Sequence, residues 1–181
     1  MSSHIPKLMG ILNCTPDSFY PNSRFNQDIN YKIYNNADYI DIGFESSRPG
    51  ANPVSLKDEQ NRLYKFINSG YSFTKPISID TYKPEIADIA LKNGFNIIND
   101  IKAGSNNGKM FEVAAKHKCP IIIMHMKGDP LIMQNNPQYS NIMDELLYFF
   151  DKKVTFAKKI GLNNKQLILD PGLGFGKTVA H

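Results

Sequence analysis

The chain has 181 residues, of which 41% are hydrophobic and 21% are charged, and its formal net charge is +4. These values fall in the globular range, and the length suits one domain with a sizeable core better than two domains. The basic residues are scattered without long runs, so the charge pattern excludes a nucleic-acid-binding tail. A mild positive balance suits an anionic small molecule, and lysines on solvated helix faces would give the same balance.

Several features predict a cytoplasmic protein without a membrane partner. No apolar run approaches the ~18 residues of a membrane span. The first ten residues, MSSHIPKLMG, have no apolar signal-peptide region. Cys14 and Cys119 are not in a C-x-x-C pattern and favour a reducing compartment over a disulfide framework. Because no linker or low-complexity segment interrupts the chain, we expect residues 1–181 to form one domain.

Short apolar runs alternate with segments of helical pattern. The predicted strands are residues 8–13, 39–43, 76–80, 97–101, 120–125 and 167–172. The runs are nearly continuous in Ile, Leu and Met, which is typical of parallel strands buried on both faces. Repeated strand–helix alternation predicts a parallel α/β sheet, either open and doubly wound or closed as a barrel.

Three of the intervening segments predict helices. In residues 55–70, Ser55 is the expected N-cap and Gly70 the stop. Residues 83–94 carry Pro84 in the first turn and end at a glycine.

The longest predicted helix, residues 141–161, carries an apolar stripe that we interpret as core. The stripe consists of Met143, Leu146, Phe150, Val154 and Ala157. Residues 26–38, by contrast, are only weakly helical in pattern.

Polar residues follow nearly every predicted strand. They are Asn13, residues 41–45, Asp80, Asn99 with Asp100, His125 and Asp170. In parallel α/β proteins ligands bind at the carboxyl edge of the strands, so this recurrence predicts one convergent site. The alternative is that each residue caps a helix or a turn.

The residue types limit the chemistry of that site. Asp80, Asn99 and Asp170 offer acceptors and one amide donor, which suit a flat, nitrogen-rich heterocycle with an amidine-like edge. Asn13 and Asp17 offer oxygens compatible with Mg²⁺. Arg48 follows the second strand and suits a phosphate or a carboxylate.

Other catalytic patterns are absent from the sequence. It contains no supported Ser/His/Asp constellation and no zinc-ligand spacing. Residues 171–178, PGLGFGKT, imitate a phosphate-binding loop, but Pro171 stands where its first glycine belongs. The glycines allow close backbone approach, and the N-terminus of a following helix could hold an anion.

Six ordered segments resemble the dihydropteroate synthase family. They are MGILNCTPDSF (9–19), DIGFESSRPGA (41–51), SIDTYKPEIADIAL (78–91), IINDI (97–101), IMHMKGDPLIMQ (123–134) and LILDPGLGFGKT (167–178). The resemblance implies a (β/α)8 TIM barrel and an alkyl-transferring enzyme of folate synthesis. Such an enzyme joins 6-hydroxymethyl-7,8-dihydropterin diphosphate to 4-aminobenzoate, uses Mg²⁺, forms homodimers and is the sulfonamide target.

The resemblance also implies roles for individual residues. Asn13 matches the metal ligand, and Asp80, Asn99 and Asp170 match the residues that grip the pterin ring and support catalysis. Ser47 and Arg48 match positions beside the diphosphate and the pterin. Asp17 and Phe19 match a first loop that shapes the aminobenzoate pocket.

The sequence departs from the family pattern in four places. Residues 20–24, YPNSR, replace a flexible Ser-Asp-Gly-Gly-Arg pattern, and Phe44 stands where a small residue is usual. Residues 26–38 are shorter than the family's first helix. The chain stops at His181 after the sixth strand, whereas an eight-stranded barrel takes roughly 250 residues.

The early stop predicts an incomplete barrel of six βα units. Strands seven and eight, their pterin- and diphosphate-binding cations and the usual dimer helices would then be missing. Two alternatives to a working synthase follow. One is an inactive fragment of that enzyme, and the other is a pterin-binding module without condensation activity.

Overall fold

The computed structural model describes residues 5–15, 34–46, 52–70, 73–104, 107–128, 133–134 and 136–181. The strands are β1 (Met9–Asn13), β2 (Tyr39–Gly43), β3 (Ile77–Asp80), β4 (Ile97–Asp100), β5 (Ile121–Met124) and β6 (Leu167–Asp170). The helices are α1 (Leu56–Asn68), α2 (Pro84–Lys92), α3 (Lys109–His117), α4 (Ile142–Ile160) and the short 3-10 helix η3 (Asn164–Gln166).

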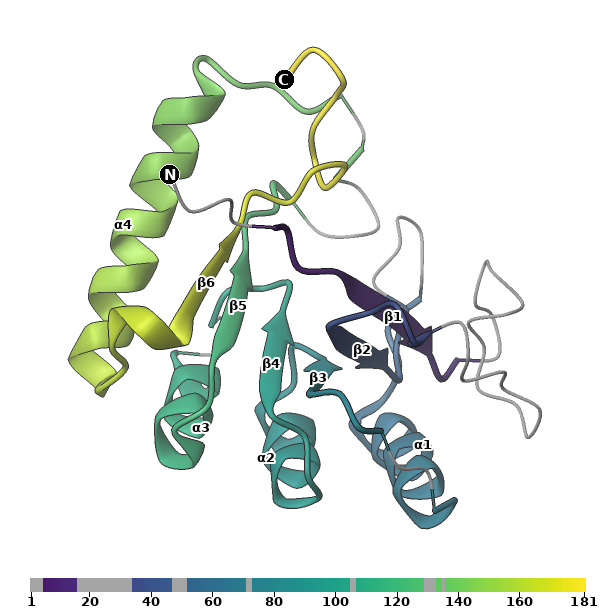
Figure 1. Ribbon diagram of the computed structural model, residues 1–181. Helices are drawn as coiled ribbons and strands as arrows, with labels where there is room; N and C mark the ends of the chain where they lie inside the picture. The colour runs from purple at the N-terminus through teal and green to yellow at the C-terminus, as the bar shows by residue number, and fades with distance from the viewer. Residues whose placement is uncertain are drawn as a thin grey trace.

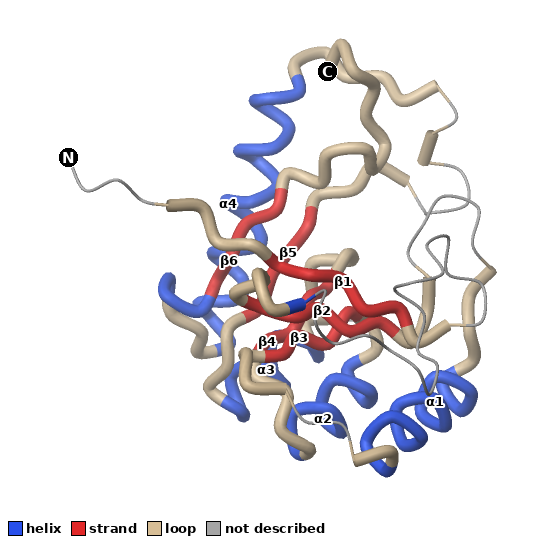
Figure 2. Tube along the Cα trace, turned by 45° about the vertical axis from the view of Figure 1, so that its right-hand side comes forward, coloured by secondary structure: helices blue, strands red, loops and turns tan. Residues whose placement is uncertain are grey.

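The six strands form one parallel sheet in the order β1-β2-β3-β4-β5-β6. Helices α1 to α4 all lie on the same side of this curved sheet (Figure 1), and the rotated view shows the same arrangement (Figure 2). A doubly wound sheet carries helices on both faces and reverses its strand order. The structure therefore decides between the two predicted architectures in favour of the barrel type, with six βα units present.

The main hydrophobic core lies between the sheet and the helices. Alternate strand side chains point toward the helices and are fully buried, among them Leu12, Ile42, Ile79, Ile98 and Ile123. Because strand side chains alternate between faces, the residues between these point to the opposite face of the sheet. That opposite face carries Asn13, Asp80, Asn99 and Asp170. Asp100, by contrast, lies on the side of the helices, where it accepts hydrogen bonds from the N–H groups of its own loop.

The predicted helix ends are confirmed by local hydrogen bonds. The Ser55 side chain accepts a hydrogen bond from the Asp58 backbone N–H at 3.1 Å, which satisfies an orphan donor at the start of α1. Asn141 caps α4 in the same way, accepting from the N–H groups of Met143 and Asp144. Gly161 ends α4 with a φ of +111°, a conformation that favours glycine.

The sequence analysis missed helix α3. Its N-cap is Gly108, which offers no side-chain hydrogen bond, so the usual start signal is absent. The helix is held instead by packing, since Met110, Phe111 and Ala114 are fully buried.

The interpretation of the α4 stripe as core is wrong at its start. Met143 is 59% exposed, Leu146, Phe150 and Val154 are half-buried, and Ala157 is the buried residue of this helix. The first half of α4 extends past the carboxyl ends of the neighbouring strands in both views (Figures 1 and 2). An amphipathic pattern there has no sheet beneath it among the described residues.

Candidate functional site

A row of site residues crosses four adjacent strands. Asn13 pairs in register with Gly43, Gly43 with Asp80, and Asp80 with Asn99. All four occupy the last or penultimate position of their strands on the face away from the helices. The structure therefore brings the predicted residues Asn13, Asp80 and Asn99 together at one level of the sheet.

Asp170 lies on the same face, two residues nearer the carboxyl edge. Asn99 pairs with Ile122, Ile122 pairs with Ile168, and Asp170 follows Ile168 by two positions. One Asp170 oxygen, Oδ1, accepts a hydrogen bond from the Gly172 N–H at 2.7 Å. This bond engages one oxygen of the carboxyl group, and among the described residues no hydrogen bond engages Oδ2.

Gly43 opens a gap between two of these side chains. A Cβ atom at this position would lie 3.3 Å from Asp80 Oδ2 and 3.6 Å from Asn13 Oδ1. The absence of a side chain lets both oxygens approach the same space. Two acceptor oxygens facing one gap suit a cation or a group rich in N–H donors.

The environment of Asp80 disfavours its charged form. Burial raises the pKa of Asp80 well above its usual value, and the nearby carboxyl groups of Asp41, Glu59, Asp100 and Glu45 raise it further. A perturbed carboxyl group at a strand end is a marker of a functional site. A ligand that donates hydrogen bonds or brings positive charge would relieve this unfavourable setting.

Asn99 is held by Asp41, which the sequence analysis counted only within the polar stretch 41–45 and gave no role of its own. Asn99 Nδ2 donates a hydrogen bond to Asp41 Oδ2 at 2.8 Å, across the intervening strand β3. Asp41 is only 5% exposed. The available signal was a carboxylate in the middle of the apolar strand YIDIG.

A buried charge network ties together the loops after β2 and β3. The Lys83 ammonium pairs with both Glu45 and Glu59, and the Thr81 hydroxyl donates to Glu59 Oε1 at 2.7 Å. Glu45 also accepts hydrogen bonds from the Tyr82 hydroxyl and from a backbone N–H further along its own loop. Burial alone would lower the pKa of Lys83, but its two carboxylate partners together raise it.

The loop after β6 is anchored by Lys177. Its ammonium donates to the carbonyl oxygens of His125, Gly172 and Phe175, each at 3.1 Å, and lies 3.0 Å from His125 Nδ1. Residues 171–181 form turns and bends, and no helix N-terminus lies within this segment. The glycine-rich pattern serves close backbone packing instead.

Several predicted residues lie outside the described part of the chain. They are Asp17, Phe19, Ser47, Arg48 and the altered loop at 20–24. Across the described ranges there is no cluster of three or more His, Cys, Asp or Glu side chains arranged for a metal ion. Among the same residues, no helix is both long and apolar enough to cross a membrane.

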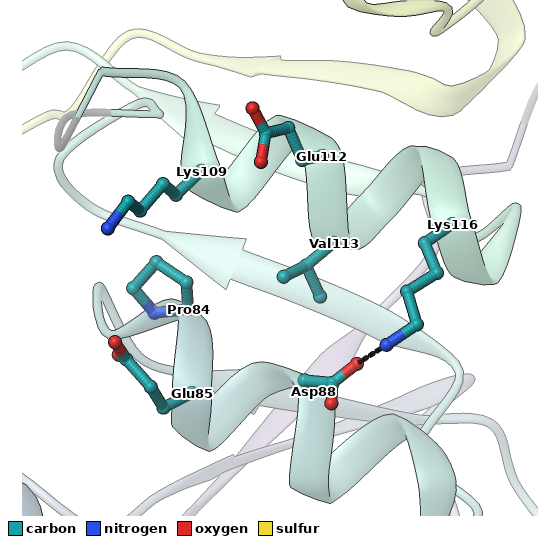
Figure 3. A pocket seen from close by; sticks show the side chains of 7 residues that line it. All are labelled: Pro84, Glu85, Asp88, Lys109, Glu112, Val113 and Lys116. Carbon is teal, nitrogen blue, oxygen red and sulfur yellow. Dashed lines mark hydrogen bonds and ion pairs between the residues drawn. The ribbon is translucent and has the colours of Figure 1, made fainter.

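A hollow of about 310 Å³ lies on the opposite, helical side of the sheet, between α2 and α3 (Figure 3). Its carboxylate Asp88 is already paired: Oδ1 accepts from Lys116 Nζ at 2.8 Å and lies 2.7 Å from His117 Nε2, and Oδ2 pairs with Lys92. These cations hold the pKa of Asp88 well below its usual value. Such mutual pairing is typical of a solvated contact between helices rather than a binding site.

The consecutive parallel βα units and the polar row at their carboxyl ends define a barrel-type protein with a candidate small-molecule site on the face away from its helices. A family model described as pterin binding enzyme matches residues 9–181. The chain belongs to this family of pterin-binding enzymes.

Several curated relatives of the chain are named dihydropteroate synthase. The chain is 42% identical over 178 residues to the dihydropteroate synthase of Synechocystis and 39% identical over 183 residues to that of Escherichia coli. These alignments cover 94% and 97% of the chain but 62% and 64% of the two relatives. The chain thus spans less than two thirds of the length of these curated relatives.

The fold is also similar to solved dihydropteroate synthases. A Yersinia pestis structure with a sulfonamide drug superposes with a TM-score of 0.87 at 37% identity, covering 97% of this chain and 66% of that one. A Burkholderia cenocepacia structure with 7,8-dihydropteroate gives a TM-score of 0.80 at 34% identity, covering 98% of this chain and 62% of that one.

Proposed function

We propose that this chain carries the pterin-gripping part of a dihydropteroate synthase site. The protein would join 6-hydroxymethyl-7,8-dihydropterin diphosphate to 4-aminobenzoate and release 7,8-dihydropteroate and pyrophosphate. The observation that carries the proposal is the row of Asn13, Asp80 and Asn99 in register, with Asp170 on the same face. The relatives that bear this enzyme's name support it.

The donor and acceptor pattern of the row matches the ring. A pterin has a guanidine-like edge with several N–H donors, and the carboxyl groups of Asp80 and Asp170 are acceptors for such an edge. Asn99 adds one acceptor and one further donor. Held on rigid strands, these groups fix the ring plane and thereby the direction in which its side-chain carbon points.

The reaction needs no nucleophile from the protein. The amine of 4-aminobenzoate attacks the methylene carbon, the new C–N bond forms, the C–O bond to the diphosphate breaks, and the amine proton goes to solvent. Positive charge develops on the pterin side of the breaking bond. The carboxyl groups of Asp80 and Asp170 stabilise that charge, which is the main electrostatic contribution of this chain.

We propose that Mg²⁺ binds beside Asn13 with the diphosphate. The neutral Asn13 oxygen borders the gap at Gly43, and Mg²⁺ commonly takes only a few protein oxygens together with waters and phosphates. When bound, the ion supplies positive charge that stabilises the leaving pyrophosphate. Asp17 remains a predicted residue of the first loop that shapes the aminobenzoate pocket. Phe19, Ser47 and Arg48 remain predicted contacts for the aminobenzoate, the diphosphate and the pterin, and the homodimer and the cytoplasmic location likewise remain predictions.

The direct test is turnover of the pterin diphosphate with labelled 4-aminobenzoate by the purified protein. We expect labelled dihydropteroate, lost in D80N and retained in K116M, whose side chain lies on the helical surface. Calorimetric titration separates the alternatives. Pterin binding without binding of 4-aminobenzoate in the presence of pyrophosphate would favour a binding module, and failure of the folded protein to bind pterin would overturn the proposal.

A further inference from the structure

Asp41 is a buried carboxyl group in the middle of an apolar strand. Its neighbours along the chain, Ile40 and Ile42, are core residues, and Asp41 itself is 5% exposed. Burial of a carboxyl group is costly unless hydrogen bonds compensate it. Burial accordingly raises the pKa of Asp41. The hydrogen bond from Asn99 and the nearby side chain of Ser78 lower this pKa and so oppose the effect of burial. A residue maintained at such a cost needs a role beyond packing.

The compensating contact leads directly to the candidate site. Asp41 Oδ2 accepts the hydrogen bond from Asn99 Nδ2 at 2.8 Å. The two residues are 58 positions apart in sequence and two strands apart in the sheet. No other hydrogen bond from a described side chain fixes the Asn99 amide.

This bond determines which arm of the amide faces the ligand. A carboxylate only accepts hydrogen bonds, so the amide nitrogen of Asn99, not its oxygen, must point to Asp41. The Oδ1 atom then takes the opposite arm. Asn99 thereby offers an acceptor with one remaining N–H donor in a fixed orientation.

We propose that Asp41 is a positioning residue that fixes the orientation of the Asn99 amide and so determines the donor and acceptor pattern offered to the bound heterocycle. The inference rests on the proposed function for the identity of that heterocycle. It assigns to Asp41 no contact with the ligand. It predicts that removing the carboxylate, as in D41A, weakens ring binding without removing any ring contact.

A double-mutant cycle with 6-hydroxymethylpterin as the calorimetric probe tests this inference. We expect D41A, which leaves no side-chain acceptor for Asn99 Nδ2, to weaken binding about 10- to 100-fold, because a misoriented amide leaves one polar contact unpaired. In the N99A background the same substitution should have no further effect. The control is S78A, which alters the residue paired in register with Asp41 and should change affinity less than about threefold.

Two outcomes of the cycle would overturn the inference. The first is wild-type affinity in D41A. The second is an equal loss caused by D41A in the presence and absence of the Asn99 side chain, which would mean that Asp41 acts independently of Asn99. Circular dichroism and thermal unfolding of each variant show whether it is folded.

A measurement without ligand keeps the inference separate from the proposed function. In the NMR spectrum of the free protein, the Asn99 side-chain amide protons should exchange slowly with solvent, and D41A should remove this protection. Unchanged protection in D41A would overturn the positioning role. Failure of the wild-type protein to bind the pterin would count against the proposed function, while the NMR result would still decide the role of Asp41.

Discussion

At the residue scale, Asp80 is a site residue whose environment lowers the stability of the folded protein while favouring ligand binding. Its carboxyl group is partly buried at the end of β3, and four other carboxyl groups lie near it. Such a setting favours a donor-rich ligand and disfavours the empty charged state. Functional sites commonly carry this kind of local destabilisation.

We predict that D80N unfolds at a higher temperature than the wild type at pH 7 and no longer binds pterin. A carboxyl group whose pKa is raised by folding lowers stability above its usual pKa of 3.8, and this cost disappears as the pH falls toward that value. The gain from D80N should therefore shrink between pH 7 and pH 4. Thermal unfolding at both pH values measures it.

The control for that prediction has the opposite sign. Cations lower the pKa of Asp88, so its contribution is present above its usual pKa and is lost as the pH falls below that value. D88N should therefore lower the unfolding temperature at pH 7, modestly because the pairs are at the surface. An equal shift in both variants would contradict the electrostatic explanation.

The sequence predicted the residues of the site better than the contacts that hold them. Asn13, Asp80, Asn99 and Asp170 could be identified because each follows an apolar strand, and parallel strands end at one edge. The bond between Asp41 and Asn99 could not be, since it joins positions far apart in the chain and depends on the strand register.

At the scale of elements, the network around Lys83 holds the loop after β2 to helices α1 and α2. We predict that K83M lowers the free energy of unfolding by about 3–5 kcal/mol, because it leaves two buried carboxylates without their cation. Lys83 is 14% exposed and Glu59 is fully buried, so solvent screens this pair little. Urea unfolding measures the loss, which should be smaller at acidic pH, where the carboxyl groups are protonated.

The matched comparison is K116M on the helical surface. The Lys116 side chain is 60% exposed and pairs with Asp88, so its loss should cost less than about 1 kcal/mol. Similar losses in the two variants would show that the network of Lys83 contributes no more than a surface pair.

The loop after β6 allows a second element-scale prediction. At Gly172, where φ is +67°, an added Cβ would lie 2.1 Å from the His125 carbonyl oxygen. At Gly174, where φ is +82°, an added Cβ meets nothing within 4 Å. G174A should therefore cost about 1 kcal/mol of backbone strain, and G172A clearly more, with weaker pterin binding because Asp170 moves. Equal stabilities in urea would contradict this difference.

The elements also show where sequence patterns fail. Helices α1, α2 and α4 carry clear caps, prolines or glycine stops, and each was predictable. Helix α3 has a glycine as its N-cap. It is stabilised by the burial of its own residues Phe111 and Ala114, which requires the folded sheet. The apolar pattern at the start of α4 predicted burial. A periodic apolar stripe, however, does not specify which other element packs against it.

At the scale of the whole molecule, the sheet is not uniformly protected. Within the described residues, strands β2 to β5 each have two strand neighbours, whereas β1 and β6 have one. In β5, Ile121 and Ile123 are fully buried, while Ile168 and Leu169 of β6 are 44% and 48% exposed. Local opening requires less disruption where packing and pairing are reduced.

We predict that amides of β3 and β4 exchange with solvent at least about tenfold more slowly than those of β6 in native-state hydrogen exchange. This gradient would place Asp80 and Asn99 on the rigid centre of the sheet and Asp170 on its more mobile margin. The ring-gripping pair would then be preorganised before ligand arrives, whereas Asp170 would become ordered as ligand binds. If the amides of β6 exchange as slowly as those of β4, the predicted gradient is contradicted. If bound pterin slows amide exchange in β6 no more than in β4, the predicted ordering of Asp170 is contradicted.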